Sequence, residues 1–216
     1  MDMKDVFKKR IVVSVLAVVA VAFVAALYLL TFPSGEKVTE KTPPGENVIC
    51  LGDSLTSGVG ASPGMDYPTQ LSWLISVTVI NAGVPGDTTE GALKRLDRDV
   101  LSKSPRIVLV VLGLNDLAGG VPVEEIFSNL EKIVKRIQAR GAMVVVGGID
   151  VPRFGKGLRG SYKRLCEETG ALLIPDIYEG IIGHEDLMSD ELHPNDKGYQ
   201  IMAERFYGVI RGYLQP

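Results

Sequence analysis

The chain has 216 residues and is poor in the residues that metal and redox sites need, because it contains only two cysteines and two histidines. Neither cysteine belongs to a Cys-x-x-Cys pair, so we expect no structural zinc site. Cys50 falls in a predicted strand and Cys166 in a predicted helix. We expect both to be buried free thiols rather than partners in a disulfide, and we assign no metal or cofactor to the chain.

An excess of charge of one sign is also lacking. The formal net charge is -3, and acidic and basic residues are interspersed, so there is no basic stripe of the kind that nucleic-acid-binding proteins carry. The sequence also lacks the G-x-G-x-x-G and G-K-[ST] loops that bind nucleotide phosphates. Nucleic acid is therefore not an expected partner. A flavodoxin-like nucleotide-binding module, with residues 52–60 at a helix start, is kept as an alternative.

A long uncharged run lies near the N-terminus. Residues 11–32 carry no charge, and at about 1.5 Å per helical residue they reach about 33 Å, enough to cross a bilayer core. The run is longer than the roughly 7–15 apolar residues of a signal peptide, and its one Ala-x-Ala lies inside it. We expect a transmembrane anchor rather than a long signal peptide. The basic N-terminus, residues 1–10, would then be cytoplasmic and the remainder extracytoplasmic.

Composition divides the rest of the chain in two. Residues 33–46 are rich in Ser, Gly, Glu, Lys, Thr and Pro, which predicts a flexible tether because such a segment buries too little apolar area to fold. Residues 47–216 carry apolar runs that alternate with amphipathic patterns, and they are predicted to form one domain with a packed core.

Five short apolar runs in this domain predict strands over residues 47–51, 77–81, 106–112, 142–148 and 171–174. Amphipathic helices are predicted over residues 87–104, 122–140, about 158–170 and from about 194 onward. The strand runs show no polar alternation and are separated by single helices. They therefore predict an α/β fold, a three-layer α/β/α sandwich around a five-stranded parallel sheet.

Glycine and polar residues gather after four of the five predicted strands. They form the segments Gly52-Asp53-Ser54-Leu55, residues 81–88, Gly113-Leu114-Asn115-Asp116 and residues 190–193. The carboxyl ends of parallel strands share one edge of a sheet, and functional groups gather there in open α/β folds. We therefore expect these four segments to meet.

Residues in these segments supply the parts of a serine hydrolase. Ser54 would be the nucleophile, His193 its general base, and Asp190 the carboxylate that orients the imidazole. A spacing of three residues lets Asp190 reach the ring of His193. A rival pair, His184 with Asp186, is predicted to lie further from any strand end.

An acyl-transfer intermediate also needs fixed donors for its oxyanion. The candidates are the backbone N–H groups of Ser54 and Gly86 and the side-chain amide of Asn115. As purely structural residues, Gly86 would be a turn glycine and Asn115 a capping residue. The convergence of the segments at one sheet edge favours the functional interpretation.

In all four segments the chain resembles the SGNH superfamily of GDSL-type esterases and lipases, over residues 48 to about 213. The residues of its motifs are most similar to those of the bacterial thioesterase I, arylesterase and lysophospholipase L1 group. The resemblance implies an SGNH hydrolase fold of flavodoxin-like type and a serine ester hydrolase without a cofactor. It also implies site residues, namely Ser54, Asp190 and His193 as catalytic, Ser54, Gly86 and Asn115 as the oxyanion hole, and Asp53 and Asp116 as supporting residues.

The substrate would be a small-molecule or lipid ester, and an acyltransferase using the same acyl-enzyme is the alternative. Residues 151–160, where substrate loops would lie, are short and rich in glycine. For that reason the acyl-chain preference of the family is not carried over to this chain.

Overall fold

The computed structural model describes residues 45–151 and 158–214 of the chain. The predicted anchor over residues 11–32 and nearly all of the tether fall outside the described residues, so both stay predictions. Within the described ranges, no helix is long and apolar enough to cross a membrane.

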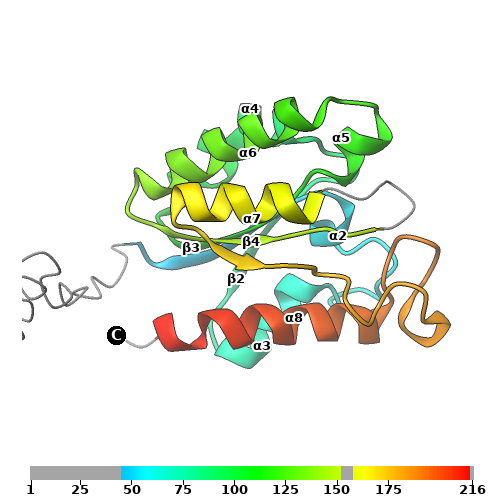
Figure 1. Cartoon of the computed structure of the whole chain (residues 1–216). Coiled ribbons are helices and arrows are strands. Elements are labelled where there is room, and N and C mark those ends of the chain that lie inside the picture. The colour runs from blue at the N-terminus through cyan, green and yellow to red at the C-terminus, as the bar shows by residue number, and fades with distance from the viewer. Residues whose placement is uncertain (1–44, 152–157, 215–216) are drawn as a thin grey trace, which may run out of the picture. The chain divides into compact units, whose positions relative to one another are not determined.

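Five parallel strands form one sheet in the order β2-β1-β3-β4-β5, as Figure 1 shows. Their bounds are β1 Asn47–Gly52, β2 Val79–Gly83, β3 Pro105–Val111, β4 Met143–Gly147 and β5 Leu172–Ile174. The inner strands β1, β3 and β4 are almost entirely buried, which explains why their sequences are continuous runs of Val, Ile and Leu. The predicted five-stranded parallel sheet is confirmed.

Helices cover both faces of this sheet. In Figure 1, α3 and α8 pack together on one face, and α4, α6 and α7 lie on the other. The larger helices are α3 Tyr67–Ile75, α4 Thr89–Asp99, α6 Val123–Gln138, α7 Leu158–Thr169 and α8 Asp196–Ile210. The short ones are α2 Ser54–Ser57 and α5 Leu114–Ala118, with 3-10 turns η1 Leu101–Lys103, η3 Glu185–Leu187 and η4 Arg211–Tyr213. The three-layer α/β/α sandwich is confirmed.

The fold differs from the sequence prediction in several elements. The short helices α2 and α5 were not predicted, and the helix predicted over residues 87–104 ends at Asp99, before the 3-10 turn η1. Strand β2 starts at Val79 rather than at residue 77, because Val79 is the first residue to pair with β1, through Val48. Helix α3 was not predicted. Its inner face is buried, but Trp73 and Leu74 on the same helix are exposed, so the apolar periodicity that signals a helix is weak there.

The two cysteines are buried free thiols, as expected. Cys50 lies in β1, and burial raises the pKa of its thiol far above the ordinary range. The pKa of Cys166, on α7, is also raised by burial, to about 11. Neither thiol is therefore a nucleophile at neutral pH.

Two glycines let the chain turn sharply at the carboxyl edge of the sheet. A Cβ atom on Gly52 would lie 2.0 Å from Thr56 Oγ1, and one on Gly83 would lie 2.2 Å from the main-chain nitrogen of Ser57. Both distances are shorter than non-bonded atoms allow, so α2 can sit against the ends of β1 and β2 only because these positions lack side chains. This close packing places Ser54 at the sheet edge.

Candidate active site

Ser54, the first residue of α2, lies beside His193, although the two are 139 positions apart in the sequence. His193 Nε2 is 3.1 Å from Ser54 Oγ. The other ring nitrogen, Nδ1, is 2.8 Å from Asp190 Oδ2. The fold therefore brings the predicted nucleophile, base and orienting carboxylate into one hydrogen-bonded row.

The carboxylate of Asp190 is held by its own loop. Its Oδ1 accepts hydrogen bonds from the main-chain N–H groups of Leu192 and His193, each at 2.8 Å. Partial burial acts to raise the pKa of Asp190, but the hydrogen bonds from Leu192 and His193 outweigh it and lower the pKa to about 2. The side chain is 54% exposed, and it stays ionised throughout the neutral range.

The loop that carries His193 is attached to the core by a buried tyrosine. Tyr178 donates its hydroxyl hydrogen to the carbonyl oxygen of Leu192 at 2.6 Å. The main-chain N–H of Ser189 donates to the carbonyl oxygen of His193 at 2.8 Å and closes the loop on itself. These contacts hold the imidazole at the sheet edge, and they could not be read from the sequence.

Asp53 connects the first and third polar segments. Its Oδ1 caps α2 by accepting from the N–H of Leu55 at 3.0 Å, and its Oδ2 accepts from Asn115 Nδ2 at 3.2 Å. Burial raises the pKa of Asp53 to about 6, although its backbone hydrogen bonds oppose the shift. Asn115 Nδ2 also donates to the carbonyl oxygen of Asp87 at 2.9 Å. Both side-chain amide hydrogens of Asn115 thus have acceptors. If Asn115 donates to a substrate, that hydrogen bond must share or replace the longer one, to Asp53.

The raised pKa of Asp53 leads to a prediction about stability. A carboxyl group with a folded pKa above its unfolded value stabilises the protein at low pH, and this contribution is lost as pH rises through the folded pKa. Here the ordinary value is 3.8 and the folded value is about 6. Asp53→Asn cannot titrate at this position. As pH rises from 4 to 7, the unfolding free energy of the wild type should therefore fall by about 2 kcal/mol relative to that of the variant. Urea unfolding at both pH values measures this, and a difference independent of pH would contradict it.

Gly86 occupies a tight turn. The N–H of Asp87 donates to the carbonyl oxygen of Val84 at 3.0 Å, and Gly86 has a φ of +76°. With Pro85 second and glycine third, this is a type II turn, whose third position favours glycine. Gly86 is therefore the turn glycine that the structural interpretation expected, and it also borders the cavity beside Ser54.

A cavity of about 320 Å³ opens over Ser54. Its polar wall is formed by residues of all four predicted segments, Asp53, Ser54, Gly86, Asn115 and His193. Its apolar wall comprises Val59, Pro85, Leu114, Ala118, Tyr178 and Leu192. The predicted convergence of the four segments at one sheet edge is thus what the structure shows, and of the apolar wall only Val59, Ala118 and Tyr178 lie outside those segments.

Asp116 has a different position from its neighbour Asn115. Its carboxylate is buried and accepts from both the N–H and the hydroxyl of Thr89, the latter at 2.6 Å. These bonds link α5 to the first turn of α4. Asp116 does not border the cavity over Ser54, so the supporting role predicted for it stays a prediction.

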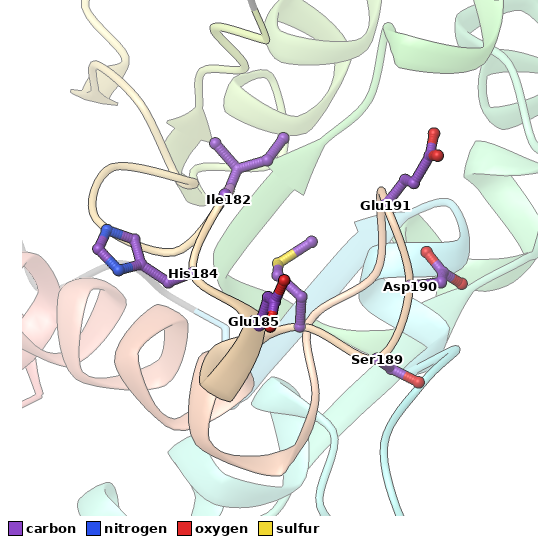
Figure 2. Close-up of a pocket in the computed structure, with 8 residues that line it drawn as sticks. Ile182, His184, Glu185, Ser189, Asp190 and Glu191 are labelled. Atoms are coloured by element: carbon purple, nitrogen blue, oxygen red, sulfur yellow. The ribbon is translucent and has the colours of Figure 1, made fainter.

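The rival pair of the sequence prediction lies elsewhere. His184 borders a second cavity, about 650 Å³, beside the loop that carries Asp190. In Figure 2, His184 and Asp190 lie on opposite sides of this cavity. The larger cavity has neither Ser54 nor His193 in its wall, so its size does not identify the reactive centre. Across residues 45–151 and 158–214, no cluster of His, Cys, Asp or Glu side chains could hold a metal ion.

Comparison with known proteins finds a matching family model and similar sequences. The model of the GDSL-like Lipase/Acylhydrolase family matches residues 50–201. The chain is 34% identical over 170 residues to the arylesterase of Vibrio mimicus, covering 74% of this chain and 85% of that protein. It is 28% identical over 186 residues to the thioesterase 1/protease 1/lysophospholipase L1 of Escherichia coli strain K12, covering 82% and 86%.

Solved structures are similar over the same part of the chain. The psychrotrophic esterase EstA from Pseudoalteromonas sp., in a structure inhibited by monoethylphosphonate, has a TM-score of 0.71 at 32% identity, covering 78% of this chain and 98% of that chain. The SGNH-hydrolase family esterase AlinE4 has a TM-score of 0.63 at 30% identity, covering 80% and 99%. By family model, sequence and fold, the chain belongs to the GDSL-like lipase/acylhydrolase family, the SGNH hydrolases, and is an ester hydrolase.

Proposed function

We propose that the chain hydrolyses carboxylic esters through an acyl-enzyme formed on Ser54. The observation that carries this proposal is the row of hydrogen bonds from Ser54 Oγ through His193 to Asp190, at the wall of an open cavity. Asp190 accepts the hydrogen of Nδ1 and so favours the tautomer of His193 with a free electron pair on Nε2. That nitrogen can take the proton of Ser54 as Oγ attacks.

Each step then has a group in reach. Ser54 Oγ bonds to the ester carbonyl carbon, and the carbonyl electron pair moves to oxygen. When the bond to the leaving alcohol breaks, His193 gives that alcohol its proton. Water next attacks the acyl-enzyme while His193 accepts a proton. When the bond between the acyl carbon and Oγ breaks, His193 returns this proton to Ser54 Oγ, and the carboxylic acid leaves.

The oxyanion of both tetrahedral intermediates needs donors. We assign this role to the N–H groups of Ser54 and Gly86 and to Asn115 Nδ2, because the three residues border the same cavity. A single donor of this kind is commonly worth a factor of about 10²–10³ in kcat. For Asn115, the developing charge would replace Asp53 as acceptor at the longer of its two hydrogen bonds.

The cavity suits a small acyl or aryl group. Ligand pockets commonly range from about 300 to 1,000 Å³, and about 320 Å³ is at the low end of that range. Val59, Leu114 and Ala118 give it an apolar wall. We therefore propose that short-chain or aryl carboxylic esters, or the corresponding thioesters, are preferred over long-chain lipids.

A series of p-nitrophenyl esters tests this function. We expect kcat/KM to be highest for acetate or butyrate and to fall for octanoate and palmitate, with one equivalent of free acid released per nitrophenol. Acid release separates hydrolysis from acyl transfer, in which the acyl group would leave on an added alcohol. A protein that turns over none of these esters would contradict the proposal.

We further propose that the domain acts outside the cytoplasm, attached by the anchor predicted over residues 11–32. The support is in the sequence, where the uncharged run follows a basic N-terminus and precedes a tether. Alkaline extraction of membranes from expressing cells checks this. An anchored chain should stay in the membrane pellet at full length, and release of a shortened chain would instead indicate a cleaved signal peptide.

A further inference from the structure

A nearly buried cation lies between the carboxyl ends of β1 and β2. The side chain of Arg95, on α4, is only 10% exposed. Its Nη2 donates to the carbonyl oxygen of Gly52 at 3.0 Å, and its Nη1 donates to that of Ala82 at 2.8 Å and to Asp99 Oδ2 at 3.2 Å. Its Nε donates to Asp87 Oδ2 at 2.7 Å. One side chain thus joins two strand ends, the turn after β2 and its own helix.

The acceptors of Arg95 adjoin the groups proposed to bind the oxyanion. Gly52 lies two positions before Ser54, and Asp87 directly follows Gly86. The main-chain carbonyl oxygen of Asp87 also accepts a hydrogen bond from Asn115 Nδ2. Each proposed donor is therefore close to a residue that Arg95 binds. Ser54 and Gly86 lie one or two positions from such a residue in the sequence, and Asn115 donates directly to one.

The chemistry of the guanidinium explains why arginine suits this position. Burying a charge costs free energy unless it is paired and all its donors find acceptors. A planar guanidinium has donors that point in several fixed directions, so it can reach a carboxylate and two carbonyl groups at once. A lysine ammonium on its flexible stem cannot hold these acceptors apart in the same geometry.

Asp87 is held from two further sides. Its Oδ1 accepts from the N–H of Thr88 at 3.0 Å. It also lies directly over Gly91, where a Cβ atom would come within 2.1 Å of Oδ1. The carboxylate therefore fits between the guanidinium of Arg95 and the glycine surface of α4. A change on either side must move the carboxylate of Asp87, and the same residue carries the carbonyl oxygen that accepts from Asn115.

We propose that Arg95 is a positioning residue for the oxyanion hole. By holding Asp87, whose carbonyl oxygen accepts from Asn115 Nδ2, it sets the direction of the Asn115 amide before the substrate arrives. This inference rests on the proposed function, because it assumes that Asn115 binds the oxyanion. Preorganised donors act mainly on the transition state, so loss of Arg95 should lower kcat rather than raise KM.

Arg95→Met tests this, because methionine keeps an apolar stem and removes the donors. With p-nitrophenyl acetate we expect kcat to fall by about 10–10²-fold, while KM changes by less than about threefold. Arg98→Met is the matched control. Arg98 lies on the same helix and also pairs with Asp99, but it is 78% exposed and should leave kcat unchanged. Equal kcat values for wild type and Arg95→Met would overturn the proposal.

A double-mutant cycle with Asn115→Ala separates positioning from a general structural role. If Arg95 acts through Asn115, the double variant should be little worse than Asn115→Ala alone, because the two changes remove one shared effect. Losses that multiply would overturn the inference and leave the proposed function intact. Full activity of Asn115→Ala would instead remove the proposed role of Asn115, and this inference with it.

Gly91→Ala approaches Asp87 from the other side and does not depend on a buried charge. Alanine is the better helix former, so the variant should fold, yet its methyl group must displace the carboxylate. We expect a similar fall in kcat with KM nearly unchanged. Gly208→Ala on α8 is the control, since a Cβ atom there meets nothing within 4 Å. If Arg95→Met fails to fold, wild-type kcat in Gly91→Ala overturns the proposal by itself.

Discussion

Replacing Ser54 with alanine should lower kcat by at least about 10⁴-fold, because no other group in the row can form the acyl-enzyme. The change removes only Oγ, whose partner His193 Nε2 lies 3.1 Å away in a partly open site. Asp53 still caps α2 through Leu55 in this variant. Ester turnover measured beside circular dichroism and the thermal midpoint should therefore show an inert protein that is folded.

Ser57→Ala is the matched control for this prediction. Ser57 lies on the same short helix, and its hydroxyl donates to the carbonyl oxygen of Ser54 at 3.1 Å, but it does not border the cavity over Ser54. We expect its kcat to stay within a few-fold of the wild type. Undiminished turnover by Ser54→Ala would exclude Ser54 as the nucleophile.

Replacing Asp190 with asparagine is expected to lower kcat by about 10²–10⁴-fold. An orienting carboxylate selects the tautomer of histidine that can accept a proton, and its amide analogue can select the wrong one. The lower part of this range applies if water compensates, since the Asp190 side chain is 54% exposed. The pKa of Asp190 is about 2, so activity lost by the wild type between pH 6 and 4 would not arise from its protonation.

Asp186→Asn serves as the control for Asp190. Asp186 belongs to η3 and is the carboxylate of the rival pair. Its predicted partner, His184, borders the larger cavity. We expect this variant to keep nearly full kcat. A greater loss in Asp186→Asn than in Asp190→Asn would transfer the orienting role to that pair and reject the proposed site.

The turn after β2 depends on both local and long-range structure. Pro85 and Gly86 predict a turn from local rules alone, because each residue favours one position of a type II turn. That the same glycine borders the cavity with Ser54 depends on β2 lying next to β1 in the sheet. The turn at Gly86 thus follows from local sequence, whereas its position beside Ser54 follows from the order of strands in the sheet.

The burial of Arg95 could not be predicted from the sequence. In the sequence it is one cation on an amphipathic helix, indistinguishable from Arg98 three positions later. Only packing decides that Arg95 faces two strand ends while Arg98 faces solvent. Burial of a charge depends on which acceptors the tertiary structure brings near, and a periodic pattern carries no information on that point.

By itself the sequence determined the class of fold, the five strands and four of the larger helices, and the four polar segments that hold Ser54, Gly86, Asn115 and His193. These follow from local periodicity and from the shared edge of parallel strands. Only the tertiary structure decided how closely His193 approaches Ser54, how large the cavity beside it is, and that a buried Arg95 joins the strand ends. Such features depend on distances between residues far apart in the chain, which are set by core packing.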